Sequence, residues 1–177
     1  FIDNDEYFKR KATLTDESGS LFPDNDERAI FFAKGVIETV KKLNWAPNVI
    51  HVHGWLASLL PLYLKEYYKD EPLFSDSKIV TSIYGQGFDD TLNKDMYNKL
   101  KFDSIEDDAI KVLEEPSYAN LMKVAINYSD ALIVGSENIP TDLEAYLNNS
   151  EKPVLEFKEK DEFGEAYTSF LTSKVLV

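Results

Sequence analysis

The two histidines of the chain, His51 and His53, lie one residue apart in the stretch VIHVHGW. An imidazole ring can donate or accept a hydrogen bond and can bind a metal ion. His-x-His supplies only two metal ligands and nothing in the sequence names a third, so we expect no metal site. The pair is a candidate for a polar binding site. Alternatively, it is structural, with His51 as a hydrogen-bonded core residue and His53 as an ordinary loop residue.

Three further features carry polar groups of weaker meaning. The segment PDNDER places Asp24 three residues before Glu27, which is the spacing of a helix capping box. The segment YGQGF, which starts at Tyr84, indicates a glycine turn, and its Gly-x-Gly is too short to cradle a phosphate. Asn120 fits the polar surface of a helix. Since the chain shows no P-loop motif and no Ser-His-Asp order, these residues alone do not identify a reaction.

The polar residues lie between segments whose apolar patterns predict regular structure. After Pro23, apolar side chains recur at helical spacing, and short β-branched runs follow. The expected strands are 49–52, 79–83, 131–135 and the segment PVLEF. The expected helices lie within 24–45, 56–68, 117–128 and 141–149, and one starts at about Asp161. The alternation predicts one α/β domain over residues 1–177, with a doubly wound, mostly parallel sheet of about four strands and helices on both faces.

In such a sheet, ligands bind beyond the carboxyl ends of the strands. His51 and His53 lie at or near that end of the first expected strand, and Gly54 starts the turn. The alternation of side chains along a strand places both rings on the same face if the strand stays regular to residue 53. The sequence therefore predicts that the histidines lie at the edge of the sheet where sites are built.

Composition excludes several classes of function. A net charge of −13 argues against binding to nucleic acid or to an anionic membrane surface. The absence of cysteine removes disulfides and thiolate chemistry and fits a reducing compartment. The longest apolar run is far shorter than a membrane span, so we expect a cytoplasmic protein. We also expect no cofactor. Because the chain starts at Phe1, we expect it to be part of a longer product.

The order and spacing of these segments resemble one family. FIDNDEYFKRK is similar to FIDNPxYFxR, FPDNDERAIFFAKGVIE to YxDNxERFxFFxxAxLE, and WAPNVIHVHGWLASLLPLYLK to PDIIHxHDWxTALxPxYLK. Two similarities are weaker: IVTSIYGQGF resembles a strand followed by HNLAYQGxF, and NLMKVAINYSDALIVGSENI resembles NFLKxGIxYADxVxTVSPxYAxEI. These patterns belong to the bacterial glycogen synthases and plant starch synthases, which are retaining glycosyltransferases of two-domain GT-B architecture. The resemblance implies part of the Rossmann-like N-terminal domain.

The resemblance also implies an activity and a set of site residues. Members of this family transfer glucose from ADP-glucose to an α-1,4-glucan, so a nucleotide sugar and an α-glucan are the implied partners. Asp24 and His53 are the implied catalytic residues, with His53 beside the transferred glucose. The implied substrate-binding residues are Asn25, Gln86, Gly87 and Asn120. We therefore expect Asp24, His53 and Asn120 to converge on one cleft.

The chain departs from the family pattern at several points. Gly54 replaces the aspartate of HDW, and the turn after Ile83 lacks the HN pair. The family's lysine-and-glycine phosphate loop and its C-terminal GT-B domain are absent from this chain. Two hypotheses therefore stand: a domain of a glucan synthase that is active when complete, or a non-catalytic relative that binds sugar, glucan or protein. We expect this chain alone to be inactive, and an open sheet edge to allow a homo-oligomer.

Overall fold

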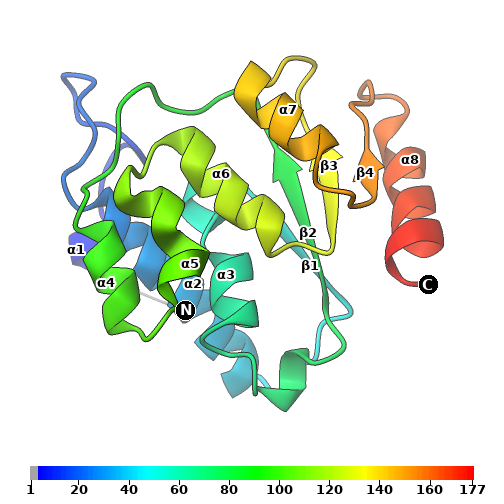
Figure 1. The fold of residues 1–177 in the computed structure, drawn as a ribbon, viewed down its shortest axis with the longest axis horizontal. Helices are drawn as coiled ribbons and strands as arrows, with labels where there is room; N and C mark the ends of the chain where they lie inside the picture. Colours follow the sequence, from blue (N-terminus) through cyan, green and yellow to red (C-terminus); the bar gives the residue numbers. More distant parts are fainter. Residues whose placement is uncertain (1–3) are drawn as a thin grey trace.

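A parallel sheet of four strands forms the centre of the protein. The computed structural model describes residues 4–177. The strands are β1 (Val49–His53), β2 (Lys78–Ile83), β3 (Ala131–Val134) and β4 (Val154–Leu155). They follow each other in the order β1-β2-β3-β4, and every neighbouring pair is parallel (Figure 1). The predicted α/β fold and its four-stranded parallel sheet are confirmed.

Helices cover both faces of this sheet, as the sequence predicts. The helices are α1 (Asp5–Phe8), α2 (Asn25–Lys42), α3 (Leu60–Lys65), α4 (Met96–Phe102), α5 (Asp107–Ile110), α6 (Tyr118–Asn127), α7 (Thr141–Asn148) and α8 (Phe163–Phe170). The larger hydrophobic core joins α2, α3, α6 and α7 to one face of the sheet, and a smaller core joins α8 to the other. Ile79 belongs to the larger core and Val80 to the smaller one, as the alternation of side chains along β2 requires.

The second face is covered by α8 and the helical turn Leu171–Val175. Phe170 and Val175 pack there against Ala131 and Ile133 of β3. His51 also belongs to this face, where its Nε2 lies 2.8 Å from the Ser82 hydroxyl and its ring lies 5.9 Å from that of Tyr167 on α8. The face therefore combines a small apolar core with a polar cluster at the end of β1.

One expectation about helices needs correction, and one region forms helices that the sequence does not predict. The segment 56–68 does not form one helix: a 3-10 turn (Trp55–Ala57) precedes α3, and Pro61 lies in the first turn of α3. Proline lacks a backbone N–H and fits only the first turn of a helix, so a new helix starts at this point. In the weakly patterned region before Pro116, the chain forms α4, α5 and a 3-10 turn (Lys111–Glu114). Their buried side chains are too few for a clear periodicity.

The capping box predicted for PDNDER is wrong, although α2 starts at Asn25. Asp24 is the N-cap residue, yet its side chain forms no capping hydrogen bond. Both of its carboxylate oxygens accept hydrogen bonds from Arg10 instead, with Nη1 to Oδ1 at 2.7 Å. Glu27 accepts hydrogen bonds from the Tyr7 hydroxyl at 2.8 Å and from the Lys99 ammonium at 2.8 Å. Charged side chains of other segments have displaced the local cap.

Arg28 joins the N-terminal segment to α2. Its side chain is 1% exposed, and its guanidinium donates hydrogen bonds to the carbonyls of Tyr7 at 2.8 Å and Thr13 at 2.7 Å. A third hydrogen bond reaches Oδ1 of Asn25. Burial lowers the pKa of Arg28, but an arginine keeps its charge at physiological pH. A buried cation needs fixed acceptors, so the segment that supplies the carbonyls is held against the helix.

We predict that Arg28→Met lowers the free energy of unfolding by about 3 kcal/mol, because two buried carbonyls and one amide lose a charged donor. The matched control is Lys11→Met, since the side chain of Lys11 is 92% exposed and its removal should change little. Urea denaturation of both variants measures the difference. Equal stability of the two variants would show that Arg28 does not hold the segment.

We also predict that the free energy of unfolding decreases as the pH is lowered, because His51 takes up a proton less readily in the folded chain than in the unfolded chain. Burial, and then the neighbouring His53, lower the pKa of His51 to about 4. An unfolded histidine has a pKa near 6.5, so the unfolded chain binds the proton first as the pH falls. The stabilisation is complete above about pH 6.5 and is lost progressively toward pH 4.

Replacement of His51 by phenylalanine removes the titration. Between pH 7 and 4.5, His51→Phe should lose about 1–2 kcal/mol less stability than the parent chain, after allowance for the partial exposure of the ring. Denaturation curves at the two pH values give this difference. An identical pH dependence in both proteins would contradict the assignment.

Candidate functional site

The carboxyl ends of the strands form the edge of the sheet where the candidate site lies. β1 ends there at His53, and the segment that follows β2 crosses from this edge to α4 (Figure 1). Gly54 has φ +72°, a conformation that side-chain-bearing residues rarely adopt, so the chain turns sharply after His53. The glycine that replaces the aspartate of HDW thus has a conformational reason in this chain.

His53 is exposed and makes one defined contact with the turn after β2. Its Nδ1 lies 2.7 Å from the hydroxyl of Tyr84, and its ring lies 4.0 Å from that of His51. Both rings therefore lie on the same face of β1, as predicted. Partial desolvation of the ring lowers the pKa of His53, so the imidazole is neutral at physiological pH. If the Tyr84 hydroxyl donates to Nδ1, the proton of the ring is on Nε2 and can be donated to a ligand.

The turn after β2 is fixed to α6 through Tyr118. The Tyr118 hydroxyl donates a hydrogen bond of 2.7 Å to the Tyr84 carbonyl. A Cβ atom on Gly87 would lie 2.3 Å from the Tyr118 ring, so only glycine allows this close approach. The ring of Phe88 packs edge-on against Trp55 and Tyr118, with centroid distances of 6.2 and 5.9 Å. The turn therefore has one defined position.

A second loop, residues 14–23, lies opposite this turn. An antiparallel bridge joins Thr15 to Leu21, and the Leu14 carbonyl accepts hydrogen bonds from the Phe22 N–H at 3.1 Å and from Nδ2 of Asn25 at 2.8 Å. Asn25 is buried, and its Oδ1 accepts from Arg28. The amide of Asn25 therefore positions the loop from the start of α2.

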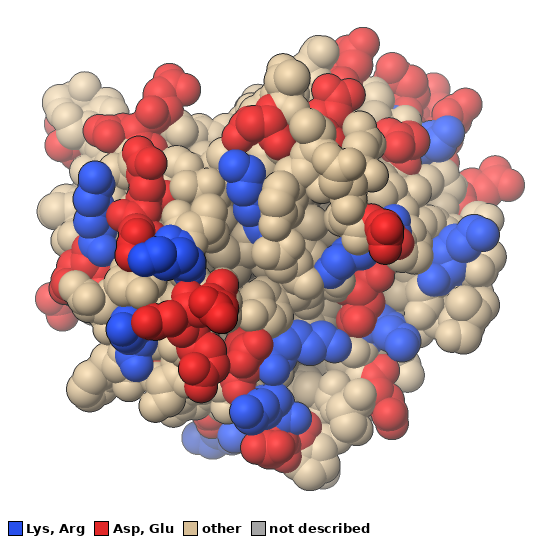
Figure 2. Space-filling model, in the orientation of Figure 1, with Lys and Arg blue, Asp and Glu red and all other residues tan. Residues whose placement is uncertain are grey.

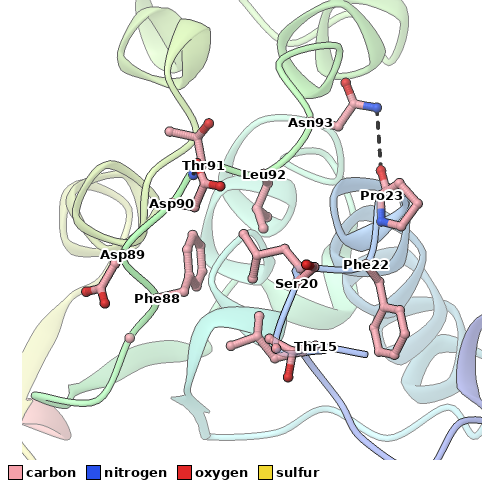
Figure 3. A pocket seen from close by; sticks show the side chains of 14 residues that line it. Thr15, Ser20, Phe22, Pro23, Phe88, Asp89, Asp90, Thr91, Leu92 and Asn93 are labelled. Atoms are coloured by element: carbon pink, nitrogen blue, oxygen red, sulfur yellow. Dashed lines mark hydrogen bonds between the residues drawn. The ribbon is translucent and has the colours of Figure 1, made fainter. Parts of the chain in front are cut away.

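The two loops border a cavity of about 730 Å³ that is open to solvent (Figure 3). The side chains of Thr15, Ser20 and Phe22 line it from one loop, and those of Phe88, Asp89, Asp90, Thr91, Leu92 and Asn93 line it from the other. Nδ2 of Asn93 donates a hydrogen bond of 3.5 Å to the Pro23 carbonyl and joins the two sides. The lining mixes aromatic rings, hydroxyl groups and carboxylates, which suits a polar ligand with apolar faces.

The structure brings some of the predicted residues together and leaves others apart from the cavity. Gly87 lines the cavity, whereas Asp24, Asn25, Gln86 and His53 are not among its described lining residues. Gln86 is exposed in the turn, and Asp24 is held by Arg10, whose hydrogen bond lowers the pKa of the carboxyl group. The predicted residues thus lie at the edge of the sheet or support the loop from behind.

The side chain of Asn120 holds the segment that precedes α6. Its Nδ2 donates hydrogen bonds to the carbonyls of Val112 at 3.1 Å and Glu115 at 2.8 Å. The same connection is fixed to the segment that follows β2, because the N–H of Leu92 donates to the Pro116 carbonyl at 3.0 Å. The convergence of Asp24, His53 and Asn120 on one cleft stays a prediction.

The sequence-based site omitted the residues that line most of the cavity. Phe88, Asp89 and Asp90 follow directly after the glycine turn, in the stretch GQGFDD. An aromatic residue beside two carboxylates after a predicted strand was the available signal. Phe22 and Ser20 carried no comparable signal, because the residues before α2 show no regular pattern.

One lysine near the site, Lys99, is paired with two carboxylates. Lys99 of α4 forms hydrogen bonds with Asp26 at 2.6 Å and Glu27 at 2.8 Å. Burial opposes the charge on Lys99, but these two hydrogen bonds outweigh it and raise the pKa. Figure 2 shows acidic side chains on both sides of the hollow at the top of this view. The paired lysine fixes α4, and with it the far end of the loop that contains Asp89 and Asp90.

Two kinds of feature are absent from the described residues 4–177. No three side chains of the His, Asp and Glu types in this range are grouped as ligands for a metal ion. Among the helices described there, none has the length and apolar character required to cross a membrane.

Comparisons with known proteins identify the family. The family model described as "Starch synthase catalytic domain" matches residues 1–147. The glycogen synthase of Elusimicrobium minutum is 32% identical over 143 residues, which are 81% of this chain and 29% of that protein. The glycogen synthase of Chlorobium limicola is 45% identical over 85 residues, which are 48% of this chain and 17% of that protein.

A third relative gives the same result. The glycogen synthase of Geotalea uraniireducens is 33% identical over 136 residues, which are 77% of this chain and 28% of that protein. The chain thus spans less than a third of the length of these curated relatives. The parallel α/β sheet agrees with the Rossmann-like half of a GT-B fold. Since the family model covers most of its length, the chain belongs to the starch synthase catalytic domain family.

Proposed function

We propose that the complete protein transfers glucose from ADP-glucose to an α-1,4-glucan and acts in glycogen biosynthesis. The match to the starch synthase catalytic domain over residues 1–147 carries this proposal. It does not favour the alternative of a non-catalytic sugar-binding relative. The chain spans 29% of the glycogen synthase of Elusimicrobium minutum, so the rest of the enzyme must supply the other side of the site. This chain alone is therefore inactive in the proposal, since transfer needs a closed site.

His53 is the proposed contact to the transferred glucose. It is exposed at the carboxyl end of β1, its ring is neutral, and Tyr84 fixes its orientation. A donor placed this way can bind a sugar hydroxyl or stabilise charge that develops as the diphosphate leaves. Gln86 and Asn120 are proposed to bind substrate from the neighbouring segments. Gly87 contributes through the close approach of backbone to ligand that glycine permits.

Asp24 and Asn25 take part through the loop that they hold. The carboxylate of Asp24 binds Arg10, and the amide of Asn25 binds Leu14 and Arg28. Polar groups that are engaged in this way orient a site wall, and a change in either residue would move that wall. Both residues thus stay at the proposed sugar site, but in a positioning role in place of the catalytic role of Asp24 and the substrate-binding role of Asn25 that the resemblance implies.

We also propose that the protein is cytoplasmic and forms a homo-oligomer through β1. Within the described part of the chain, β1 pairs only with β2, so its outer edge is open. The Asn48 carbonyl accepts from the Lys78 N–H, which directs the N–H groups of Val49 and His51 away from β2. An open edge of this kind can pair with the same strand of a second copy.

We predict that an exchange of segments yields an active enzyme. In the glycogen synthase of Elusimicrobium minutum, the 143 matched residues are replaced by those of this chain. The chimera should incorporate labelled glucose from ADP-glucose into glycogen, whereas this chain alone should not. His53→Ala should lower kcat by about 100-fold, the usual effect of one lost transition-state donor.

The matched control for this exchange is His51→Gln, which changes the other histidine of the pair and should keep kcat within a few-fold. A folded chimera without activity would contradict the proposed function. Activity that survives His53→Ala unchanged would remove His53 from the site but leave the family assignment intact.

We predict that Val49→Pro abolishes self-association and leaves the fold intact. The N–H of Val49 faces away from β2, so proline removes a donor at the open edge without breaking the bonds between β1 and β2. Sedimentation should show concentration-dependent association for the parent chain and a monomer for the variant. A monomeric parent at high concentration, or association that survives in the variant, would contradict the role of this edge.

A further inference from the structure

Helix α8 is attached to the protein differently from the other long helices. It lies in residues 148–177, outside the range that the family model matches. Residues 158–162, which connect β4 to α8, are all exposed. In Figure 1, α8 lies beyond β4 and away from α2, α3 and α6. The helix is therefore tethered to the sheet by a segment that makes little contact of its own.

The apolar contact that holds α8 is small. The helix buries one residue, Phe170, and the turn that follows it buries Val175, whereas α6 buries six residues. These two side chains pack with Val80, Ala131 and Ile133 of the sheet. Burial of one large apolar side chain contributes about 1.5–3 kcal/mol. Release of α8 therefore costs less free energy than unfolding of the larger core, and it can occur as a local opening.

The rest of the contact is polar and centres on His51. Its Nε2 lies 2.8 Å from the Ser82 hydroxyl, and its ring lies 5.9 Å from that of Tyr167 on α8. The titratable groups that face His51 are Tyr167 of α8 and His53 of β1, with Tyr84 beyond His53. Among residues 4–177, no carboxylate is paired with the His51 ring. A positive charge on this ring would thus lie between α8 and the sheet without a counter-ion.

A proton on His51 therefore opposes the docking of α8. Burial, and then His53, lower the pKa of His51 to about 4, whereas a histidine in water has a pKa near 6.5. Since α8 is the helix that covers this face, its release returns the ring to water. Docking is then most favourable above about pH 6.5 and weakens about tenfold for each pH unit below it, down to about pH 4, because one proton is linked.

We propose that α8 is a proton-sensitive cover, which lies on the second face of the sheet while His51 is neutral and leaves this face when His51 is charged. Release exposes the two histidines and the apolar side chains of Val80, Ala131 and Ile133, while the larger core keeps the sheet folded. The inference does not depend on glucosyl transfer. It adds control over the charge that lies beside His53.

The test is hydrogen–deuterium exchange of the 177-residue chain at about pH 7, 6 and 5, corrected for the intrinsic effect of pH on exchange. Protection of residues 163–175 should fall about tenfold between pH 6 and 5, while the amides of β2 and β3 keep their protection. His51→Gln retains a hydrogen-bonding group beside Ser82 but does not titrate, so it should abolish this fall. His51→Phe is a second non-titrating variant. His53→Gln is the matched control and should retain the pH dependence.

Linkage requires the reciprocal effect, so release of α8 must change the pKa of His51. Phe170→Ser removes the main apolar contact of α8, and the pKa of His51, measured by NMR, should then rise from about 4 toward 6.5. Ser169→Ala is the matched control, because Ser169 is exposed on the same turn of α8. It should change neither the protection of α8 nor this pKa.

Four results would overturn the inference. The first is that α8 loses protection only together with β2 and β3, as in global unfolding. The second is that its protection is the same at pH 6 and 5. The third is that the pH dependence survives in both His51 variants. The fourth is that Phe170→Ser releases α8 without raising the pKa of His51. An inactive chimera would contradict the proposed transfer reaction and leave this inference unaffected.

Discussion

The buried guanidinium of Arg28 is the constraint on which the candidate site depends. A charge that is 1% exposed is tolerated only when it is surrounded by acceptors, and two of the three acceptors are carbonyls of the N-terminal segment. This segment has little regular structure of its own, since α1 is four residues long. Its path from Asn4 to Pro23 is therefore set by Arg28, by the pair of Arg10 with Asp24, and by the amide of Asn25. One wall of the cavity follows from these contacts.

The other wall follows from the topology of the sheet. Parallel strands bring the ends of β1 and β2 to the same edge, and each end carries a turn. His53 lies on the first turn and the segment from Tyr84 to Asp90 forms the second. The glycines at 54 and 87 permit a sharp turn and a close aromatic contact, respectively. Side chains from distant parts of the sequence thus meet at one edge, with a neutral imidazole beside an acidic cavity.

Much of the fold could be predicted from the sequence, because the strands are apolar and the main helices have a regular period. The four strands and the helices α2 and α6 lie where their patterns place them, and the paired histidines share one face as the alternation requires. The prediction of one helix over 56–68 was wrong, because the apolar pattern does not show that Pro61 must lie in the first turn of a new helix.

The site was less predictable than the fold, because its contacts join segments far apart in the chain. The spacing of Asp24 and Glu27 fits a cap, yet Arg10 and Lys99 compete for the same carboxylates, and no local rule includes them. An arginine at this position of a helix is expected on the surface, but Arg28 is buried. Its acceptors lie in an N-terminal segment that has no regular sequence pattern, so the burial could not be predicted. The residues of the cavity wall were missed for the same reason, apart from the stretch GQGFDD.

The central proposal is that the two independently held loops at the edge of the sheet contribute to the site of the proposed glucan substrate. The most direct measurement is an NMR titration of the isotope-labelled chain with maltoheptaose, which reports each backbone amide separately. The account predicts shift changes in the amides of residues 14–22 and 87–93, with the amides of α8 unaffected. Changes centred on α8, or no change at millimolar maltoheptaose, would contradict it.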